Sequence, residues 1–442
     1  MTFSQLLPSK PRLCKVLHIT AHLGGGVGKV LSRLVALSAQ REDGIQHVIA
    51  CLETPEKPYF VNYARIHGGK VLICPERETL DEAVAAADIV QLEWWHHPVV
   101  AAWLGTGTLL PMRLVVWSHI SGLYVPALPL AFVTAPHRFL FSSPCTWSHP
   151  EFMALPVDVR GKVDAVFSSG GFDDLPDAPV RPMDSALRVG YLGTLNFAKL
   201  HPRLLDFVAA VDVENFRLVL VGDPSTGEAL LDEATRRGLS NRLEIRGYRS
   251  DVAAELSGFD VLAYLLNPLH YGTTENALLE AMAMGVVPIV LDNPAERCLV
   301  RDGETGLIVD SPHAFAAALT RLSSEPGTRR RLSHAADQDV RRRFAVGHTA
   351  ERLLVHYRAM MAEKKRTWDF RSIFGDSPAD WFRSCQGPEA WRFRDDGTVD
   401  MCGEPPPVLY EASKGSVFHY QRTFPDDPRL ASWAQAVMHK LG

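Results

Sequence analysis

The sequence predicts an α/β protein of two Rossmann-like domains, with a cleft between them and a C-terminal extension. Short runs of Val, Ile and Leu alternate with helical patterns up to residue 168, and a second such set runs from residue 188 to residue 309. Continuous apolar strands separated by helices are typical of a parallel sheet covered on both faces. After residue 365 the pattern is lost. Ligands of such sheets bind beyond the carboxyl ends of the strands, so two sheets in tandem predict a ligand between them.

Each predicted domain has its own set of strands. The strands of the first are 15–22, 47–53, 70–74, 88–94, 114–119, 139–142 and 165–168. The strands of the second are 188–193, 217–222, 243–247, 260–266, 287–291 and 307–309. The segment 173–185 is rich in Asp and Pro and is predicted as the linker between them.

The last part of the chain contains two segments that differ in their apolar periodicity. Residues 347–365 carry one long apolar stripe, which predicts a helix. Residues 366–442 have little periodicity and hold Trp368, Trp381, Trp391 and Trp433 among Pro, Gly and Asp. We expect an aromatic-rich extension that packs on the body, with contact to an acceptor or a partner protein as the functional alternative.

Composition narrows the class of protein. The 442 residues carry a net charge of −5, which argues against a nucleic-acid-binding protein. The seven cysteines are odd in number and form no Cys-x-x-Cys motif, which favours reduced thiols in a cytoplasmic protein. The first 11 residues lack the apolar core of a signal peptide, and the apolar run 123–141 contains three prolines. We therefore expect a cytoplasmic protein, with peripheral attachment to the inner face of a membrane as an open alternative.

The stretch 264–292 is the most informative part of the sequence. It predicts a buried strand at 264–266, a polar turn at 270–274, a helix over about 275–284 and a left-handed residue at Gly285. The free N–H groups and the dipole of such a helix form an anion site. Glu280 lies one to two turns into the helix, where its carboxylate could accept two hydroxyls of a sugar. The stretch thus fits a nucleoside diphosphate with its ribose, and the alternative is a plain αβ unit with a solvated glutamate.

The segment LLEAMAMGVVPIV, residues 278–290, resembles the donor-binding segment of retaining GT-B glycosyltransferases of glycosyltransferase family 4. The resemblance covers most of residues 15–365. It implies transfer of a sugar, with retention, from a nucleotide-diphosphate sugar to a hydroxyl of a glycan or glycolipid acceptor, without a metal or other cofactor. It also implies four parts: an acceptor domain (1–183), a donor domain (184–345), a helix crossing back to the first domain (346–365) and the extension (366–442).

The resemblance assigns a role to Glu280 and exposes a departure. Two glutamates with seven residues between them flank the turn in the family, and Glu280 matches the second, which binds the ribose. The first falls at Gly272, which leaves the donor-sugar contact without its usual residue. Glu275 is the nearest carboxylate, although continuous helix geometry would place it roughly 140° from Glu280. Thr273, Thr274 and Asn276 supply the N–H groups of the turn.

A second departure lies in the loop 193–199. The family has Gly-Arg followed by Lys, and both cations neutralise the departing diphosphate. Lys199 matches the lysine, whereas Thr194 replaces the arginine. We therefore expect the backbone N–H groups of the loop to stabilise more of the negative charge of the diphosphate, or another cation to take the place of the arginine. The candidates for that substitution are Arg246, Arg249 and His201.

Other matches to the family surround the expected cleft. Gly25 and Gly26 resemble the first-loop glycines of the family, which face the donor diphosphate and the acceptor, and the alternative is a tight strand-to-helix turn. His119 resembles the family's histidine that meets the donor sugar, and the alternative is a core or cap histidine. Loops that end at Asp223 and at Tyr248 and Arg249 resemble those around the nucleotide base. The catalytic candidates are thus His119, Lys199, Glu275 and Glu280.

Three alternatives stay open. His96 and His97 are a second histidine candidate, and because adjacent residues point in different directions, we expect one of them at most to serve. No Asp or Glu at suitable spacing joins them, so no metal set is expected, and Asp337 and Asp339 are expected on a solvated helix face. A sugar-nucleotide epimerase on the same fold and a non-catalytic nucleotide-sugar-binding partner of another transferase are the functional alternatives.

Overall fold

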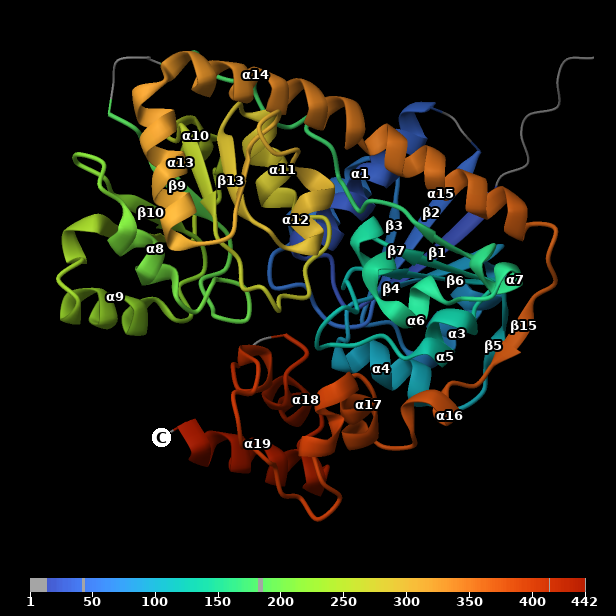
Figure 1. The fold of residues 1–442 in the computed structure, drawn as a ribbon. Coiled ribbons are helices and arrows are strands. Elements are labelled where there is room, and N and C mark those ends of the chain that lie inside the picture. Colours follow the sequence, from blue (N-terminus) through green and yellow to red (C-terminus); the bar gives the residue numbers. More distant parts are fainter. Residues whose placement is uncertain (1–13, 42–43, 182–185, 413, 442) are drawn as a thin grey trace, which may run out of the picture.

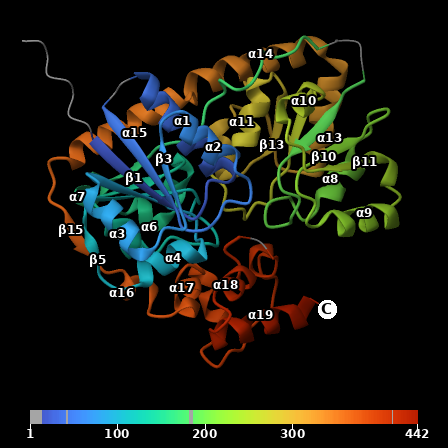
Figure 2. The ribbon, with the colours of Figure 1, turned by 180° about the vertical axis from the view of Figure 1, so that it is seen from behind.

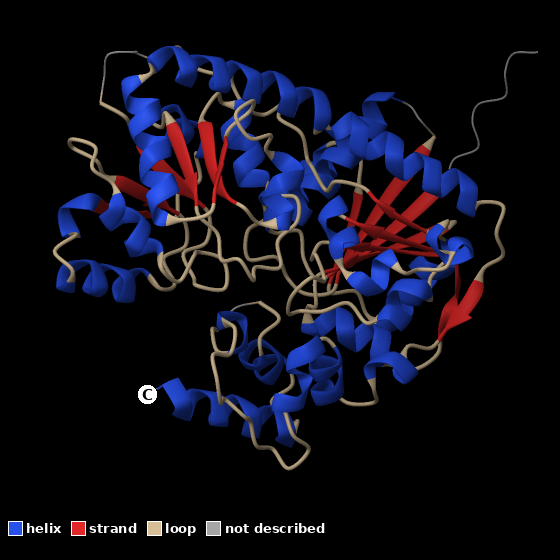
Figure 3. Ribbon diagram, viewed as in Figure 1, coloured by secondary structure: helices blue, strands red, loops and turns tan. Residues whose placement is uncertain are grey.

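The computed structural model describes residues 14–41, 44–181, 186–412 and 414–441. Within these residues, seven parallel strands form an N-terminal sheet in the order β3-β2-β1-β4-β6-β7-β8. Figure 3 shows this sheet and a second one, each flanked by helices. The strands are Cys14–Thr20 (β1), Ile45–Cys51 (β2), Lys70–Ile73 (β3), Ile89–Trp94 (β4), Leu114–Ser118 (β6), Arg138–Phe141 (β7) and Val163–Ala165 (β8).

Helices cover both faces of the N-terminal sheet because successive side chains of a strand point to opposite sides. Val16 packs into the core beneath helices α1, α2 and α15, whereas Leu17 packs into the core beneath α4 and α5. The helices of this domain are Gly25–Arg41 (α1), Tyr59–Ile66 (α2), Arg77–Ala86 (α3), Pro98–Gly105 (α4), Leu130–Thr134 (α5), Pro150–Met153 (α6) and Val157–Arg160 (α7), with a short 3-10 turn, Pro144–Ser148 (η1).

The second sheet has six parallel strands among the described residues, in the order β11-β10-β9-β12-β13-β14. These strands are Val189–Leu192 (β9), Leu218–Val221 (β10), Leu243–Gly247 (β11), Val261–Tyr264 (β12), Val287–Leu291 (β13) and Leu307–Val309 (β14). Its helices are Leu204–Ala210 (α8), Gly227–Arg236 (α9), Val252–Ser257 (α10), Asn276–Ala283 (α11), Pro294–Leu299 (α12) and Pro312–Ser324 (α13), with the 3-10 turn Ser240–Arg242 (η2). The prediction of two parallel, helix-covered sheets is confirmed.

Two consecutive helices join the domains along one side of the molecule, as Figure 1 shows in orange. Pro326–Arg343 (α14) packs on the second domain, and Val346–Met360 (α15) continues over the N-terminal domain. Leu353, Tyr357 and Met360 of α15 enter the N-terminal core, and the Tyr357 hydroxyl donates to Gln91 Oε1 at 2.6 Å. The expected linker runs as irregular chain up to residue 181, and its residues 182–185 lie outside the described part.

The extension packs on the N-terminal domain and lies below the space between the two domains, as the opposite views of Figures 1 and 2 both show. The sequence analysis missed strand Leu109–Met112 (β5), with which Arg366–Trp368 (β15) pairs antiparallel. Trp433, fully buried, joins the N-terminal core, whereas Trp391 stays 55% exposed. The helical parts of the extension are Arg371–Phe374 (α16), Pro378–Ser384 (α17), Gly387–Arg392 (η3), Pro407–Leu409 (η4), Val417–Thr423 (α18) and Pro428–Leu441 (α19).

Within the described ranges, no helix is long and apolar enough to cross a lipid bilayer.

Candidate active site between the domains

The turn between β12 and α11 faces the N-terminal domain. Leu278, Ala281 and Met282 of α11 are fully buried and Gly285 has φ +68°, as the helix pattern predicts. The helix begins at Asn276, and in the described part of the chain no protein group accepts from the N–H groups of residues 273–278. The open amide end that an anion needs is therefore present at the domain interface.

The side chains of the turn, by contrast, bind the N-terminal domain. The hydroxyl of Thr273 is 2.7 Å from Ser142 Oγ, and the Thr274 hydroxyl donates to the Ser142 carbonyl at 2.5 Å. The Ser168 N–H donates to the Thr274 hydroxyl at 3.1 Å. Both threonine side chains therefore hold the two domains together, and the backbone amides of the turn remain without an acceptor among the described residues.

Glu280 points across the cleft toward Lys29 of α1. Lys29 Nζ donates to Glu280 Oε1 at 2.6 Å, and both side chains are largely buried. Glu280 Oε2 accepts no hydrogen bond from the described residues. Gly26 lies close by, since a Cβ at Gly26 would lie 3.0 Å from Asn276 Nδ2. The sequence analysis assigned no role to Lys29, and nothing in its sequence context indicates its partner.

Glu275 lies outside helix α11, so the expected angle of roughly 140° between Glu275 and Glu280 is wrong. It precedes the helix with φ −78° and ψ 86°, so the angle of 140° between helical residues does not apply to it. Its Oε2 accepts from Lys199 Nζ at 2.8 Å and from the Tyr264 hydroxyl at 2.6 Å. A Cβ at Gly272 would lie 1.9 Å from Glu275 Oε1. The carboxylate of Glu275 therefore occupies the space that a side chain at position 272 would enter.

The pair of Glu275 and Lys199 is strongly coupled. Burial would raise the pKa of the Glu275 carboxyl, but the Lys199 ammonium and then His270 outweigh burial and lower it to about 2. Burial would likewise lower the pKa of Lys199, and the Glu275 carboxylate raises it instead. Both groups are therefore charged at neutral pH, and the carboxylate neutralises part of the cation that was expected to face the diphosphate.

The loop after β9 differs from the expectation in one contact. Thr194 is exposed, and Lys199 reaches Glu275. The N–H groups of Phe197 and Ala198 donate to the carboxylate of Glu411, a residue of the extension, at 2.6 and 2.8 Å. The Glu411 carboxylate thus binds two of the N–H groups that were expected to stabilise the negative charge of the diphosphate.

The cations proposed as substitutes for the missing arginine are engaged elsewhere. Arg246 pairs with Glu244 at 2.8 Å and with Glu255 at 2.9 Å, and Arg249 lies 3.7 Å from Glu255. The His201 ring accepts from the backbone N–H of Arg203 at 3.0 Å. None of the three contacts Lys199 or the turn at 272–276 among the described residues, so the substitution is not seen.

Tyr248 and Asp223 lie just after the carboxyl ends of β11 and β10. Tyr248 is 57% exposed, and Lys57 Nζ of the N-terminal domain lies 3.2 Å from the centre of its ring. Asp223 is exposed at the end of β10, and its carbonyl accepts from the Leu195 N–H. A cation over an aromatic face is attractive, so Lys57 and Tyr248 form a contact between the two domains.

His119 is held by a carboxylate that the sequence analysis missed. His119 Nε2 is 2.7 Å from Oε2 of Glu93, which is fully buried in β4 and also lies 3.1 Å from His18 Nδ1. Burial would raise the pKa of Glu93, but its bonds to His119 and His18 outweigh burial and lower it. A glutamate inside the strand 89–94, whose other residues are apolar except Gln91, was the signal that could have found it, since a buried charge requires partners.

The adjacent histidines separate as expected, but one of them has an acidic partner. His96 packs against Phe382 and Tyr420 of the extension, whereas His97 Nε2 lies 3.2 Å from Glu53 Oε1. His22 Nε2 lies 3.7 Å from the same oxygen. The expectation that no carboxylate joins His97 is wrong, because the carboxyl ends of β1, β2 and β4 meet at one edge of the sheet.

The hydrogen bonds of this cluster nonetheless disfavour a metal. The ligating atoms of His22, Glu53 and His97 lie within 4.8 Å of one another. The Gly24 N–H, however, donates to His22 Nδ1 at 2.9 Å, which leaves the proton of the neutral ring on Nε2. Metal-binding histidines usually donate from the second nitrogen instead. Burial lowers the pKa of His22 to about 4, so the ring is neutral at pH 7.

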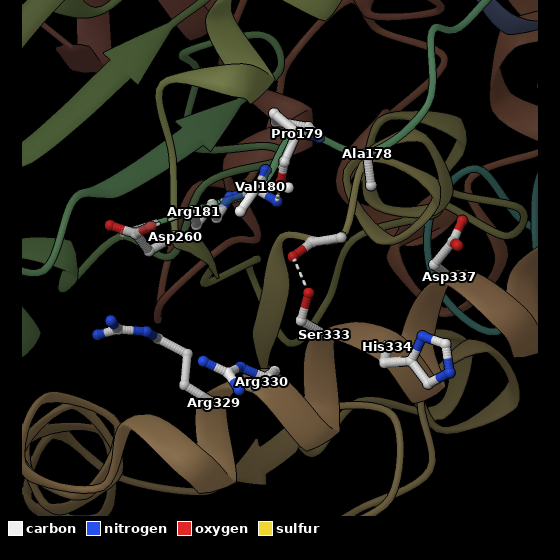
Figure 4. Close-up of a pocket in the computed structure, with 11 residues that line it drawn as sticks. Ala178, Pro179, Val180, Arg181, Asp260, Arg329, Arg330, Ser333, His334 and Asp337 are labelled. Atoms are coloured by element: carbon white, nitrogen blue, oxygen red, sulfur yellow. Dashed lines mark hydrogen bonds and ion pairs between the residues drawn. The ribbon is translucent and has the colours of Figure 1, made fainter. Parts of the chain in front are cut away.

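A separate cavity of about 360 Å³ lies at the amino ends of the donor-domain strands, opposite the site (Figure 4). Linker residues 178–181 and α14 line it, and the Ser333 hydroxyl donates there to the Gly285 carbonyl at 2.6 Å. Asp337 lies at its edge and binds Arg341. Asp339 is only 2% exposed and pairs with Arg343 at 2.9 Å, so the expected solvated face is wrong for Asp339.

Comparison with known proteins shows the fold and then a similarity of one domain to a family. A glycosyltransferase of Rickettsia africae aligns with a TM-score of 0.63 at 14% identity, over 79% of this chain and 99% of that one. Anabaena HepE, solved with UDP and glucose, aligns with a TM-score of 0.62 at 13% identity, over 78% of this chain and all of that one. The fold is therefore GT-B, as expected.

Residues 186–325 match the model of the family Glycosyl transferases group 1. The lipopolysaccharide core biosynthesis glycosyltransferase LpsE of Rhizobium meliloti is 28% identical over 130 residues, which are 29% of this chain and 37% of LpsE. The chain spans less than half the length of the curated relatives it matches. The similarity to the group 1 glycosyltransferases thus lies in the second of the two domains.

Proposed function

We propose that the chain moves a sugar from a nucleotide-diphosphate sugar to a hydroxyl of a glycan or glycolipid acceptor, with retention of the anomeric configuration. One observation carries the proposal: Lys199, Glu275 and the open amide end of α11 meet on one side of the interdomain cleft, beside Glu280. A UDP-sugar is the first donor to test, because the HepE structure holds UDP and glucose.

Each residue has a proposed task in binding the donor. Lys199 and the N–H groups of residues 273–276 stabilise the diphosphate as negative charge develops on it. Glu280 anchors the ribose through Oε2, which accepts no bond from the described chain, while Lys29 holds Oε1. Tyr248 with Arg249 and Asp223 border the base.

Glu275 is proposed to contact the donor sugar. It brings a carboxylate to the space beside Gly272, where relatives of the family carry their first glutamate. Glu275, three residues after Gly272, then supplies the carboxylate that position 272 lacks. His119, oriented by Glu93, lines the sugar pocket, and the Gly25–Gly26 turn lets backbone approach the phosphates closely.

The proposed chemistry follows from the resemblance to the family. The bond from the anomeric carbon to the phosphate oxygen breaks, and a bond from that carbon to the acceptor oxygen forms on the same face. The acceptor's proton passes to the departing phosphate oxygen, so no enzyme nucleophile is required. Closure of the domains excludes water and so prevents hydrolysis of the donor.

The test is to incubate the protein with a panel of UDP-, GDP- and ADP-sugars, each alone and with oligosaccharide or glycolipid acceptors. A transferase releases nucleoside diphosphate in an acceptor-dependent way and yields a product with the anomeric configuration of the donor. An isomerised donor would identify an epimerase instead. Donor binding without any product would identify a non-catalytic partner, and either result would refute the proposal.

A further inference from the structure

The extension contacts the second domain through the carboxylate of Glu411. Glu411 lies between η4 and α18, and its two oxygens accept the N–H groups of Phe197 and Ala198 at 2.6 and 2.8 Å. The partners are more than 200 positions apart in sequence. The contact lies directly beside Lys199, whose ammonium pairs with Glu275.

The two N–H groups form a site for an anion. They are consecutive along the chain and donate to one carboxylate, an arrangement in which backbone amides bind anions. A phosphate offers the same kind of charged oxygen acceptors as a carboxylate. The one cation of the loop 193–199 is Lys199, whose ammonium already pairs with Glu275, so a diphosphate here depends more heavily on backbone donors.

The charges around this contact oppose a second anion. Glu411 forms no salt bridge within the described chain, whereas Glu275 and Glu280 each have a lysine. Burial raises the pKa of Glu411, and its two backbone bonds offset burial only in part. A diphosphate at the same amides would meet an uncompensated carboxylate, so the carboxylate and a phosphate exclude each other.

Glu411 is able to leave without loss of the extension. The extension is anchored elsewhere, through the pairing of β15 with β5 and through Trp433 in the N-terminal core. Release of Glu411 therefore breaks two hydrogen bonds and leaves that packing in place.

We propose that the N–H pair of Phe197 and Ala198 is a phosphate subsite of the donor site, and that Glu411 occupies it while the donor is absent. The extension then regulates donor binding, because the donor must displace Glu411. The inference rests on the proposed function for the identity of the donor, but the anion site itself is testable without turnover.

The first experiment measures UDP binding by calorimetry for the wild type, Glu411→Ala, Glu411→Gln and the control Glu404→Ala. Glu404 is an exposed glutamate of the same extension. If Glu411 occupies the subsite in about nine molecules of ten, its removal tightens UDP binding about tenfold, because apparent affinity scales with the competent fraction. Glu411→Gln should shift in the same direction, and Glu404→Ala should match the wild type. Weaker UDP binding by both Glu411 variants, with unchanged unfolding midpoints, would overturn the proposal and make Glu411 a positioning residue.

The second experiment needs no nucleotide. Protein labelled with ¹⁵N in Phe and Ala is titrated with pyrophosphate while the amide signals of Phe197 and Ala198 are followed. These signals should move saturably in Glu411→Ala, and at higher pyrophosphate concentration in the wild type. Amides that do not respond in Glu411→Ala or in Glu411→Gln would overturn the subsite. A response to pyrophosphate with no binding of UDP, GDP or ADP would support the subsite and count against the proposed donor.

Discussion

Replacement of Lys199 by alanine tests the centre of the proposed site. The substitution removes the cation expected to stabilise the leaving diphosphate, and we expect kcat to fall on the order of a hundredfold, as for loss of one oxyanion donor. The effect should appear in kcat more than in KM, since the charge develops in the transition state. Lys162→Ala, at an exposed lysine of the N-terminal domain, is the control.

The same substitution should lower stability by a predictable amount. It leaves the Glu275 carboxylate buried without its cation, and breaking a buried pair from one side costs about 3–5 kcal/mol. Because the Lys199 side chain is 31% exposed, we expect about 2–3 kcal/mol in urea unfolding. Glu275→Gln should cost less, since the remaining ammonium can reach water. The double variant should be more stable than Lys199→Ala alone.

The pH dependence of the unfolding free energy is an independent test of the pair of Lys199 and Glu275. In the wild type the pKa of Glu275 is lowered from its ordinary 4.5 to about 2, so its contribution to stability is present above pH 4.5 and is lost as the pH falls toward 2. In Lys199→Ala the largest cause that lowers this pKa is removed, while His270 and the Tyr264 hydroxyl remain, so the pKa of Glu275 is higher than in the wild type and its contribution to stability above pH 4.5 is smaller. The difference in unfolding free energy between the two proteins should therefore be larger at pH 7 than at pH 4. Near-normal turnover, or a difference that shrinks toward pH 7, would refute this account of the pair.

Three further predictions concern neighbouring groups. Glu280→Gln should weaken donor binding by about 1.5–3 kcal/mol, the range for a hydrogen bond to a charged group, and unchanged affinity in calorimetry would exclude Glu280 as the ribose ligand. Gly272→Ala should lower activity with little change in the UDP dissociation constant, because a Cβ 1.9 Å from Glu275 Oε1 must displace that carboxylate; full activity would show that Glu275 does not contact the sugar. Activity should survive a chelator, since the Gly24 amide keeps the proton of His22 on Nε2, and loss of activity restored by manganese or magnesium would contradict this.

What the sequence determined by itself is the set of features that depend on neighbours along the chain. Apolar runs separated by helical patterns predicted both parallel sheets, and the stripe of Leu278, Ala281 and Met282 placed the buried face of α11. The left-handed Gly285 followed in the same way, from the end of a helix and the start of a strand. Local periodicity decides these features because it records which face of each element is buried.

Only the tertiary structure decided which charges meet. Glu275 reaches Lys199 because it stands before the helix and not on it, and Lys29 reaches Glu280 because α1 packs opposite α11. His97 contacts Glu53, and the N–H groups of Phe197 and Ala198 bind Glu411. These partners are far apart in the sequence, and no periodic pattern relates them. The carboxyl ends of strands far apart in the chain meet at one edge, so which side chains lie together there depends on strand order and domain packing.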